Sequence, residues 1–245
     1  SKNSKIFYHK SSFDDDSGYI SLKKKLDEFD IKYKTQGNRI FYLATPPKYF
    51  PIIIEKLSKA KLIYDTKKEK KKFSRVVIEK PYGRDLQTSK DLHNIVSKHL
   101  EESQIYRIDH YLGKETVQNL LVFRFANSIF ESIWNYKHID HVQITFAEED
   151  GIGTRGHFFE EQGLLRDVIQ NHVMQLLSLI AMEPPVNISA SAIRDEKVKV
   201  LQSIRTIIPQ DIEKNLIRGQ YDEGTVDGKK VNSYRDEKDV DKQSN

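Results

Sequence analysis

A short stretch in the middle of the chain gathers side chains that could bind an anion. An acid, an imidazole, a phenol and an ammonium surround Gly113: they are Asp109, His110, Tyr111 and Lys114. The apolar run 105–108 predicts a short strand before them, and a helix with apolar residues at helical spacing opens at 114–115. A helix start offers free backbone N–H groups and a positive dipole end. The pattern indicates a phosphate site, and the structural alternative is a set of caps and solvated loop residues.

A second polar group interrupts an apolar helix, which the sequence predicts over residues 164–182, between Gly163 and two prolines. Asp167, Asn171 and His172 lie near one end of this helix. A histidine that a carboxylate holds in one tautomer is the best base near neutral pH for the proton of a hydroxyl group. A lone histidine on such a helix is more often a core residue, but the polar neighbours of His172 favour a cleft.

Composition limits the function classes. The 245 residues carry a net charge of +4, which suits an anionic small molecule and does not imply nucleic acid. The absence of cysteine excludes a thiolate nucleophile and a thiolate metal site; we expect no metal, no membrane contact and no nucleic-acid partner. The lysine-rich run 67–72 lacks interleaved aromatic residues, so we interpret it as a solvated loop rather than a nucleic-acid contact.

The first part of the chain alternates strand and helix patterns. We predict strands over residues 5–9, 39–44, 76–78 and 105–108. A helix opens at 14–17, with a stripe formed by Ile20, Leu22, Leu26 and Phe29. Further helices carry Ile52, Ile53, Ile54 and Leu57, and then, after Thr88 as N-cap, Leu92, Ile95, Val96 and Leu100. This β-α order with short loops predicts a parallel sheet, and the apolar strand 39–44 predicts that both faces of the sheet are covered.

The later part has a different pattern. Apolar and polar residues alternate over 142–146, which predicts a half-buried strand, and the pattern over 192–204 predicts a helix. The charged tail after Tyr221 is predicted to be a loop or disordered. Residues 151–156 match a dinucleotide-binding glycine motif literally. That motif needs a buried strand directly before it and a helix directly after it, and here the acidic run 148–150 comes first. We therefore expect a loop beside a site rather than a cofactor-phosphate site.

Four stretches resemble the glucose-6-phosphate dehydrogenase family: RIDHYLGKE at 107–115, RDVIQNH at 166–172, EKP-x-G at 79–83 and RIFYLATPP at 39–47. The resemblance extends nearly to Tyr221. It implies an α/β fold, with an incomplete Rossmann-like parallel sheet followed by part of an α+β domain with a large antiparallel sheet. The implied domains are 1–109, a dinucleotide-binding domain without its first β-α unit, and 110–245, the first part of a substrate and dimerisation domain, with a loop or disordered tail after about residue 222.

The resemblance also implies roles for single residues. His172 would be the general base and Asp109 the carboxylate that orients it. The phosphate ligands would be His110, Tyr111 and Lys114, and the sugar-hydroxyl ligands Glu148 and Asp167. Lys80 would meet the substrate near the nicotinamide, beside a cis bond to Pro81. The cofactor contacts would be Lys80, Pro46 and Phe50, where Phe50 replaces a tyrosine that family members often have.

The function that the resemblance implies is NADP-dependent oxidation of glucose 6-phosphate to 6-phosphogluconolactone, the first step of the oxidative pentose phosphate pathway. A cytoplasmic homo-oligomer, dimer or tetramer, would be expected. The family's first β-α unit, with its glycine-rich loop for the cofactor phosphates, has no counterpart here, nor has the second half of the large sheet. The alternative is therefore a non-catalytic sugar-phosphate-binding fragment that lacks the cofactor loop.

Overall fold

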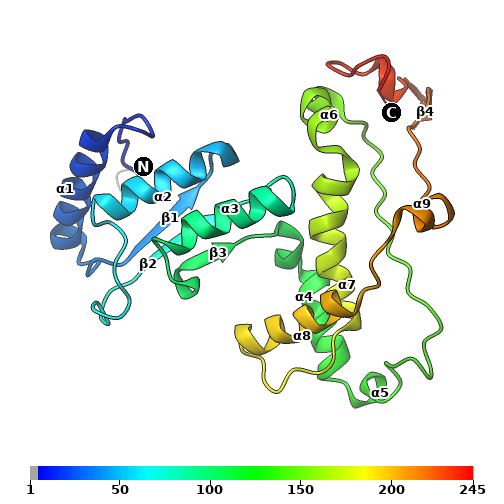
Figure 1. Ribbon diagram of the computed structural model, residues 1–245, viewed down its shortest axis with the longest axis horizontal. Helices are drawn as coiled ribbons and strands as arrows, with labels where there is room; N and C mark the ends of the chain where they lie inside the picture. The colour runs from blue at the N-terminus through cyan, green and yellow to red at the C-terminus, as the bar shows by residue number, and fades with distance from the viewer. Residues whose placement is uncertain (1–4, 245) are drawn as a thin grey trace. The chain divides into compact units, whose positions relative to one another are not determined.

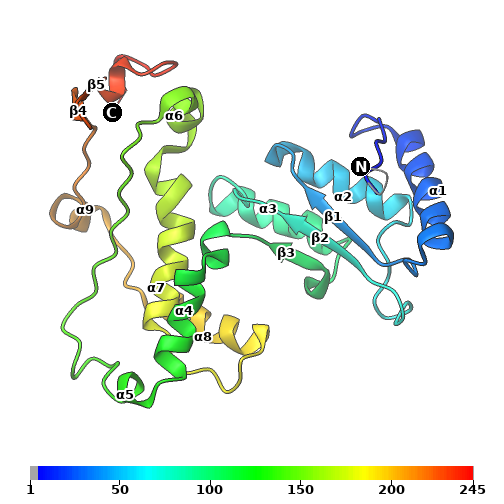
Figure 2. The same ribbon diagram turned by 180° about the vertical axis from the view of Figure 1, so that it is seen from behind.

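The computed structural model describes residues 5–244, which form two compact units (Figures 1 and 2). The first unit ends at Asp109 and the second begins at His110. No helix within residues 5–244 is both long enough and apolar enough to cross a bilayer.

A three-stranded parallel sheet organises the first unit. Its strands are β1 (Arg39–Leu43), β2 (Ser74–Ile78) and β3 (Ile105–Arg107), in that order. The helices are α1 (Asp16–Tyr33) before β1, α2 (Phe50–Lys59) between β1 and β2, and α3 (Leu86–Ser97) between β2 and β3; short 3-10 turns are η1 (Pro47–Tyr49) and η2 (Glu102–Gln104). The predicted parallel sheet is confirmed, and the carboxyl ends of its strands share one edge.

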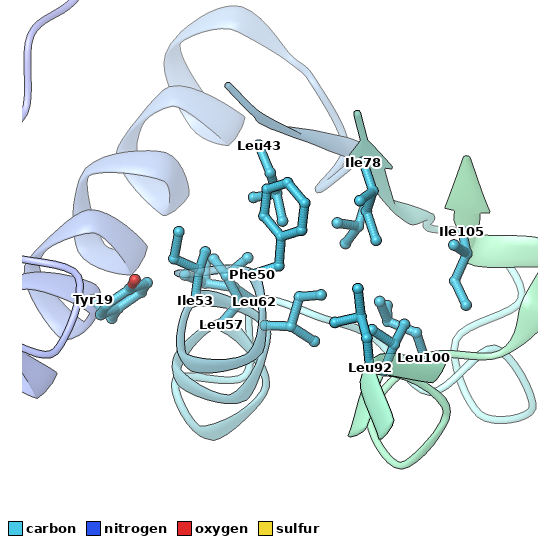
Figure 3. Packing of buried hydrophobic residues seen from close by; sticks show 13 residues of the cluster. Tyr19, Leu43, Phe50, Ile53, Leu57, Leu62, Ile78, Leu92, Leu100 and Ile105 are labelled. Atoms are coloured by element: carbon cyan, nitrogen blue, oxygen red, sulfur yellow. The ribbon is translucent and has the colours of Figure 1, made fainter. Parts of the chain in front are cut away.

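The core of the first unit lies on one face of the sheet. Figure 3 shows Phe50, Leu57 and Leu62 from the α2 region facing Ile78 of β2 and Leu92 of α3. On the opposite face, by contrast, Ile40 and Tyr42 of β1 keep 61% and 53% of their surface exposed. The prediction that the unit covers both faces of the sheet is therefore wrong. An apolar sequence run allows two-sided burial, but burial also requires a second layer of chain.

The predicted strand over residues 5–9 does not form. Instead, the Phe7 ring packs against Phe29 and Tyr33 of α1, at centroid distances of 4.4 and 6.0 Å. Ile6 is 89% exposed. An apolar run becomes a strand only when another strand completes its ladder, and residues 5–9 pair with none of the strands in residues 5–244.

The helix starts are partly as predicted. Asp15 caps α1 and accepts a hydrogen bond from the Ser17 N–H at 2.9 Å, as the acidic run 14–17 indicated. The predicted stripe of α1 is wrong at Ile20, which is 65% exposed. The cap of α3 is Asp85 rather than Thr88. Thr88 takes the third helical position of a capping box, because its hydroxyl accepts from the Asp85 N–H at 3.0 Å.

The second unit is mainly helical. Its elements are η3 (His110–Gly113), α4 (Glu115–Phe125), α5 (Ser128–Glu131), η4 (Gly153–Arg155), α6 (Gly156–Leu164), η5 (Leu165–Val173), α7 (Met174–Ala181), α8 (Ala190–Ser203), α9 (Pro209–Asn215), β4 (Gly224–Val226), β5 (Lys229–Val231) and η6 (Tyr234–Asp236). Element η5 is a π-helix. The core of α4 and α7 contains Val117, Leu179 and Met182.

Three predictions for the second unit need correction in whole or in part. Residues 142–146 form no strand, because no segment within residues 5–244 pairs with them. The long helix begins directly after Gly163, as predicted, because that residue (φ +65°) breaks the chain away from the preceding turns of α6; its first part, Leu165–Val173, is however a π-helix. The tail is not a featureless loop: β4 and β5 form an antiparallel hairpin, and Tyr234 is only 7% exposed.

Candidate functional site

The His172 side chain is buried in the second unit, at the end of the π-helix η5. Its imidazole is 2% exposed and stacks on the Tyr111 ring, with centroids 4.2 Å apart and an interplanar angle of 26°. The His110 ring meets it edge-on at 4.6 Å. Residues that lie more than sixty positions apart in the sequence are therefore packed together, on η3 and η5.

The short turn η3 presents the residues of the first motif. His110 is exposed and Tyr111 half-buried, and their rings lie 4.9 Å apart. Lys114 is the N-cap residue of α4 and is also exposed. Its ammonium nitrogen lies over the Tyr111 ring, 3.8 Å from the centroid. This is a cation–π contact that holds the charge beside the start of α4.

The four side chains together combine two chemical capacities. The Lys114 ammonium and the Tyr111 phenol can bind an anionic group at the surface. The His172 imidazole, directly beneath the phenol ring, can accept a proton from a ligand. The structure thus brings together four of the predicted site residues, His110, Tyr111, Lys114 and His172.

The two predicted hydroxyl ligands lie on segments that reach the same cluster. Asp167 is half-buried on η5, five residues before His172. Glu148 is exposed, two residues after Phe146. The Phe146 ring lies 5.2 Å from the Tyr111 ring. Phe146 is a site neighbour that sequence reasoning missed, since the alternating pattern around it indicated only a strand.

The predicted cofactor residues belong to the first unit. Pro46 follows β1 and is exposed, and Lys80 follows β2 and is half-buried. Because Leu43 pairs with Ile78, both residues follow paired strand ends at one edge of the sheet. The bond between Lys80 and Pro81 is cis, as the resemblance implied. The Phe50 ring is 0% exposed in the core, so we omit Phe50 from the proposed cofactor contacts.

Asp109 is the last residue of the first unit and is bonded directly to His110, the first residue of the second. It is half-buried. The pairing of Asp109 with His172 stays a prediction.

A buried arginine that the sequence analysis did not single out supports this site. Arg124 of α4 is 4% exposed and donates to the carbonyl oxygens of Leu179 and Met182 at 2.6 and 2.8 Å. Burial lowers the pKa of its guanidinium below the usual value. Because η3 leads into α4 and η5 leads into α7, Arg124 joins the helices that carry the two halves of the cluster. A single arginine within the apolar stretch 117–125 was the available signal.

The glycine motif 151–156 has the surroundings of a packing site. Among the described residues no strand lies directly before it; η4 lies within the motif, and α6 begins at its last glycine. A Cβ at Gly156 would lie 2.1 Å from the carbonyl oxygen of Lys238, so the tail occupies the space beside this glycine. The expectation that the motif is no dinucleotide fingerprint agrees with this context.

A parallel sheet with helical crossovers, followed by a unit that combines a cation, a phenol and a buried imidazole, defines an α/β protein suited to a phosphorylated ligand. Comparison of the chain with models of known protein families identifies one family. The model of the glucose-6-phosphate dehydrogenase NAD binding domain matches residues 2–119, and that of the C-terminal domain matches residues 121–245. The chain therefore belongs to the glucose-6-phosphate dehydrogenase family, and the resemblance seen in the sequence is confirmed.

Individual relatives agree with this assignment. The chain is 55% identical over 240 residues to a glucose-6-phosphate 1-dehydrogenase of Chlamydia pneumoniae, covering 98% of this chain and 46% of the relative. It is 41% identical to that of Bacillus subtilis, covering 99% and 48%. A solved structure described as glucose-6-phosphate dehydrogenase in complex with its substrate glucose-6-phosphate matches with a TM-score of 0.84 at 40% identity, covering 97% and 47%. The chain thus spans about half the length of these relatives.

Proposed function

We propose that this protein oxidises glucose 6-phosphate to 6-phosphogluconolactone, with hydride transfer to NADP. The observation that carries the proposal is the cluster of His110, Tyr111, Lys114 and His172, which supplies anion ligands and a buried base in one place. The similar solved structure, described as a complex with glucose-6-phosphate, supports the choice of substrate.

The residues divide the work between binding and proton transfer. His110, Tyr111 and Lys114 hold the phosphate, so that binding energy far from the reacting carbon positions that carbon. Glu148 and Asp167 accept hydrogen bonds from sugar hydroxyls. His172 takes the proton of the anomeric hydroxyl as C1 becomes the carbonyl carbon of the lactone. Asp109 orients the imidazole and stabilises its charged form.

One edge of the sheet in the first unit supports the proposal of a nicotinamide cofactor. Ligands of open α/β sheets bind outside the carboxyl ends of the strands, and Pro46 and Lys80 follow two paired strand ends at that edge. We therefore assign Pro46 and Lys80 to the cofactor, with Lys80 also meeting the substrate. When bound, the cofactor supplies the acceptor for the hydride that leaves C1.

We further propose NADP rather than NAD, a homo-oligomer, either dimer or tetramer, and a cytoplasmic location, with the reaction serving as the first step of the oxidative pentose phosphate pathway. The support for these properties is the membership of the chain in the glucose-6-phosphate dehydrogenase family.

The test is a comparison of substrates in the native enzyme. We expect NADPH formation with glucose 6-phosphate, much slower turnover with unphosphorylated glucose, and slower reduction of NAD than of NADP. Binding of glucose 6-phosphate without turnover would instead support the non-catalytic alternative, for which the comparisons give no support. Equal turnover of glucose and glucose 6-phosphate would contradict the assigned phosphate site.

A further inference from the structure

We propose that Asn171 is a positioning residue, whose carboxamide maintains the π-helical turn of η5 and thereby sets the direction of the His172 imidazole. The inference rests on the proposed function of His172. It concerns a residue beside the base that would touch neither substrate nor cofactor.

The Asn171 side chain bonds to three backbone groups of its own helix. Its Nδ2 donates to the carbonyl oxygens of Arg166 and Asp167, at 3.2 and 2.9 Å. Its Oδ1 accepts from the backbone N–H of His172 at 2.6 Å. One half-buried carboxamide therefore links the preceding turn to the amide of the catalytic histidine.

These bonds match what a π-helix needs. In an α-helix the carbonyl of residue 167 would accept from the N–H of residue 171, whereas in the wider π-turn the donor to that carbonyl is the N–H of residue 172. In addition, the side-chain Nδ2 of Asn171 donates to the Asp167 carbonyl. Residue 171 thus still supplies this carbonyl with a donor, from its side chain instead of the backbone N–H that an α-helix would use. Because π-helices are rare and mostly a single turn long, a run from Leu165 to Val173 needs such support.

The direction of the imidazole depends on this turn. Adding a residue to a helical turn rotates every side chain beyond it relative to the preceding turn. His172 lies at the far end of η5, packed against Tyr111 and His110 of η3. If η5 relaxed to an α-helix, the His172 ring would rotate away from this contact while η3, with its phosphate ligands, kept its place on α4.

Two variants and a control test the inference. Asn171→Ala removes all three bonds, while Asn171→Asp keeps an acceptor for the His172 N–H but loses the donor to the carbonyls. Gln170→Ala changes the exposed neighbour on the same turn. We expect both Asn171 variants to lower kcat about 10- to 100-fold, as small misplacements of catalytic groups do. KM for glucose 6-phosphate should stay within about threefold, because phosphate binding is unaffected, and Gln170→Ala should match the wild type.

A second measurement separates this inference from the proposed function. The ring nitrogens of ¹⁵N-histidine-labelled protein report the environment of His172 without any turnover. We expect the His172 signals to shift in both Asn171 variants and not in Gln170→Ala. Unchanged His172 signals, or wild-type kcat in an Asn171 variant, would overturn the positioning role. Shifted signals in a protein that does not oxidise glucose 6-phosphate would uphold it and reject the proposed function.

Discussion

Lys114 holds its positive charge in a fixed place where a ligand can reach it. Its ammonium rests on the Tyr111 ring at 3.8 Å from the centroid and remains exposed to solvent. The His172 imidazole lies in contact with the same ring and is buried. One phenol therefore borders both the group that would bind phosphate and the group that would take the proton. The residue types at 109–114 suggested this chemistry, but their proximity to residue 172 came from the structure and the resemblance.

Replacing Lys114 should mainly weaken binding of the phosphorylated sugar. In Lys114→Ala the phosphate loses a charge-assisted partner, and we expect the Kd for glucose 6-phosphate to rise by roughly 10- to 100-fold, as for loss of one hydrogen bond to a charged group. Isothermal titration calorimetry checks this, with Lys137→Ala as the matched exposed control. An unchanged Kd in Lys114→Ala would count against the assigned role.

At the scale of elements, the site depends on two helix junctions. The turn η3 continues into α4 and the π-helix η5 continues into α7, and Arg124 binds α4 to the carboxyl end of α7. Helical periodicity predicted both helices, because their apolar residues recur at the required spacing. It could not reveal that residues 165–173 are π-helical, since that difference lies in backbone hydrogen bonds and in the side chain of Asn171.

Truncating Arg124 should destabilise the second unit. Arg124→Ala leaves the carbonyls of Leu179 and Met182 without their guanidinium donors in a buried place. We expect the free energy of unfolding to fall by about 2–4 kcal/mol, from the lost hydrogen bonds and packing. Urea titration measures this, and the exposed Arg218→Ala should change stability by less than about 0.5 kcal/mol. Equal midpoints for the two variants would show that the bridge between α4 and α7 contributes little.

We expect the titration of Tyr234 to show that the tail is docked on α6. Burial first, and then the hydrogen bond that Tyr234 donates to Glu160 at 2.6 Å, raise the pKa of Tyr234 from 10.0 to about 12. The neutral phenol is thus favoured in the folded state. Its contribution to stability is fully present below pH 10 and is lost as the pH rises from 10 to about 12.

A tyrosinate absorbance titration of the wild type and Tyr234→Phe isolates this group. The difference between the two curves should have its midpoint near pH 12. A midpoint close to pH 10, the ordinary value for tyrosine, would show that the tail is not docked on α6 in solution.

At the scale of the whole molecule, sequence patterns predicted the positions of helices and strands better than they predicted which segments pair as strands. The order of β1, β2 and β3 followed from buried apolar runs separated by helices. The predicted strands 5–9 and 142–146 failed because a strand exists only with a partner, which its own sequence does not supply. The tail hairpin had a signal that was missed: Asp227–Gly228, both at positive φ, form the kind of turn that joins two antiparallel strands.

The most direct test of the central claim, that the His172 cluster performs the oxidation, is the turnover of His172→Asn. The substitution keeps a side chain of similar reach but removes the basic imidazole. We expect kcat to fall by about 100- to 10,000-fold, as for loss of a general base, while the Kd for glucose 6-phosphate stays nearly unchanged. Turnover close to that of the wild type would contradict the assignment of His172 as the base.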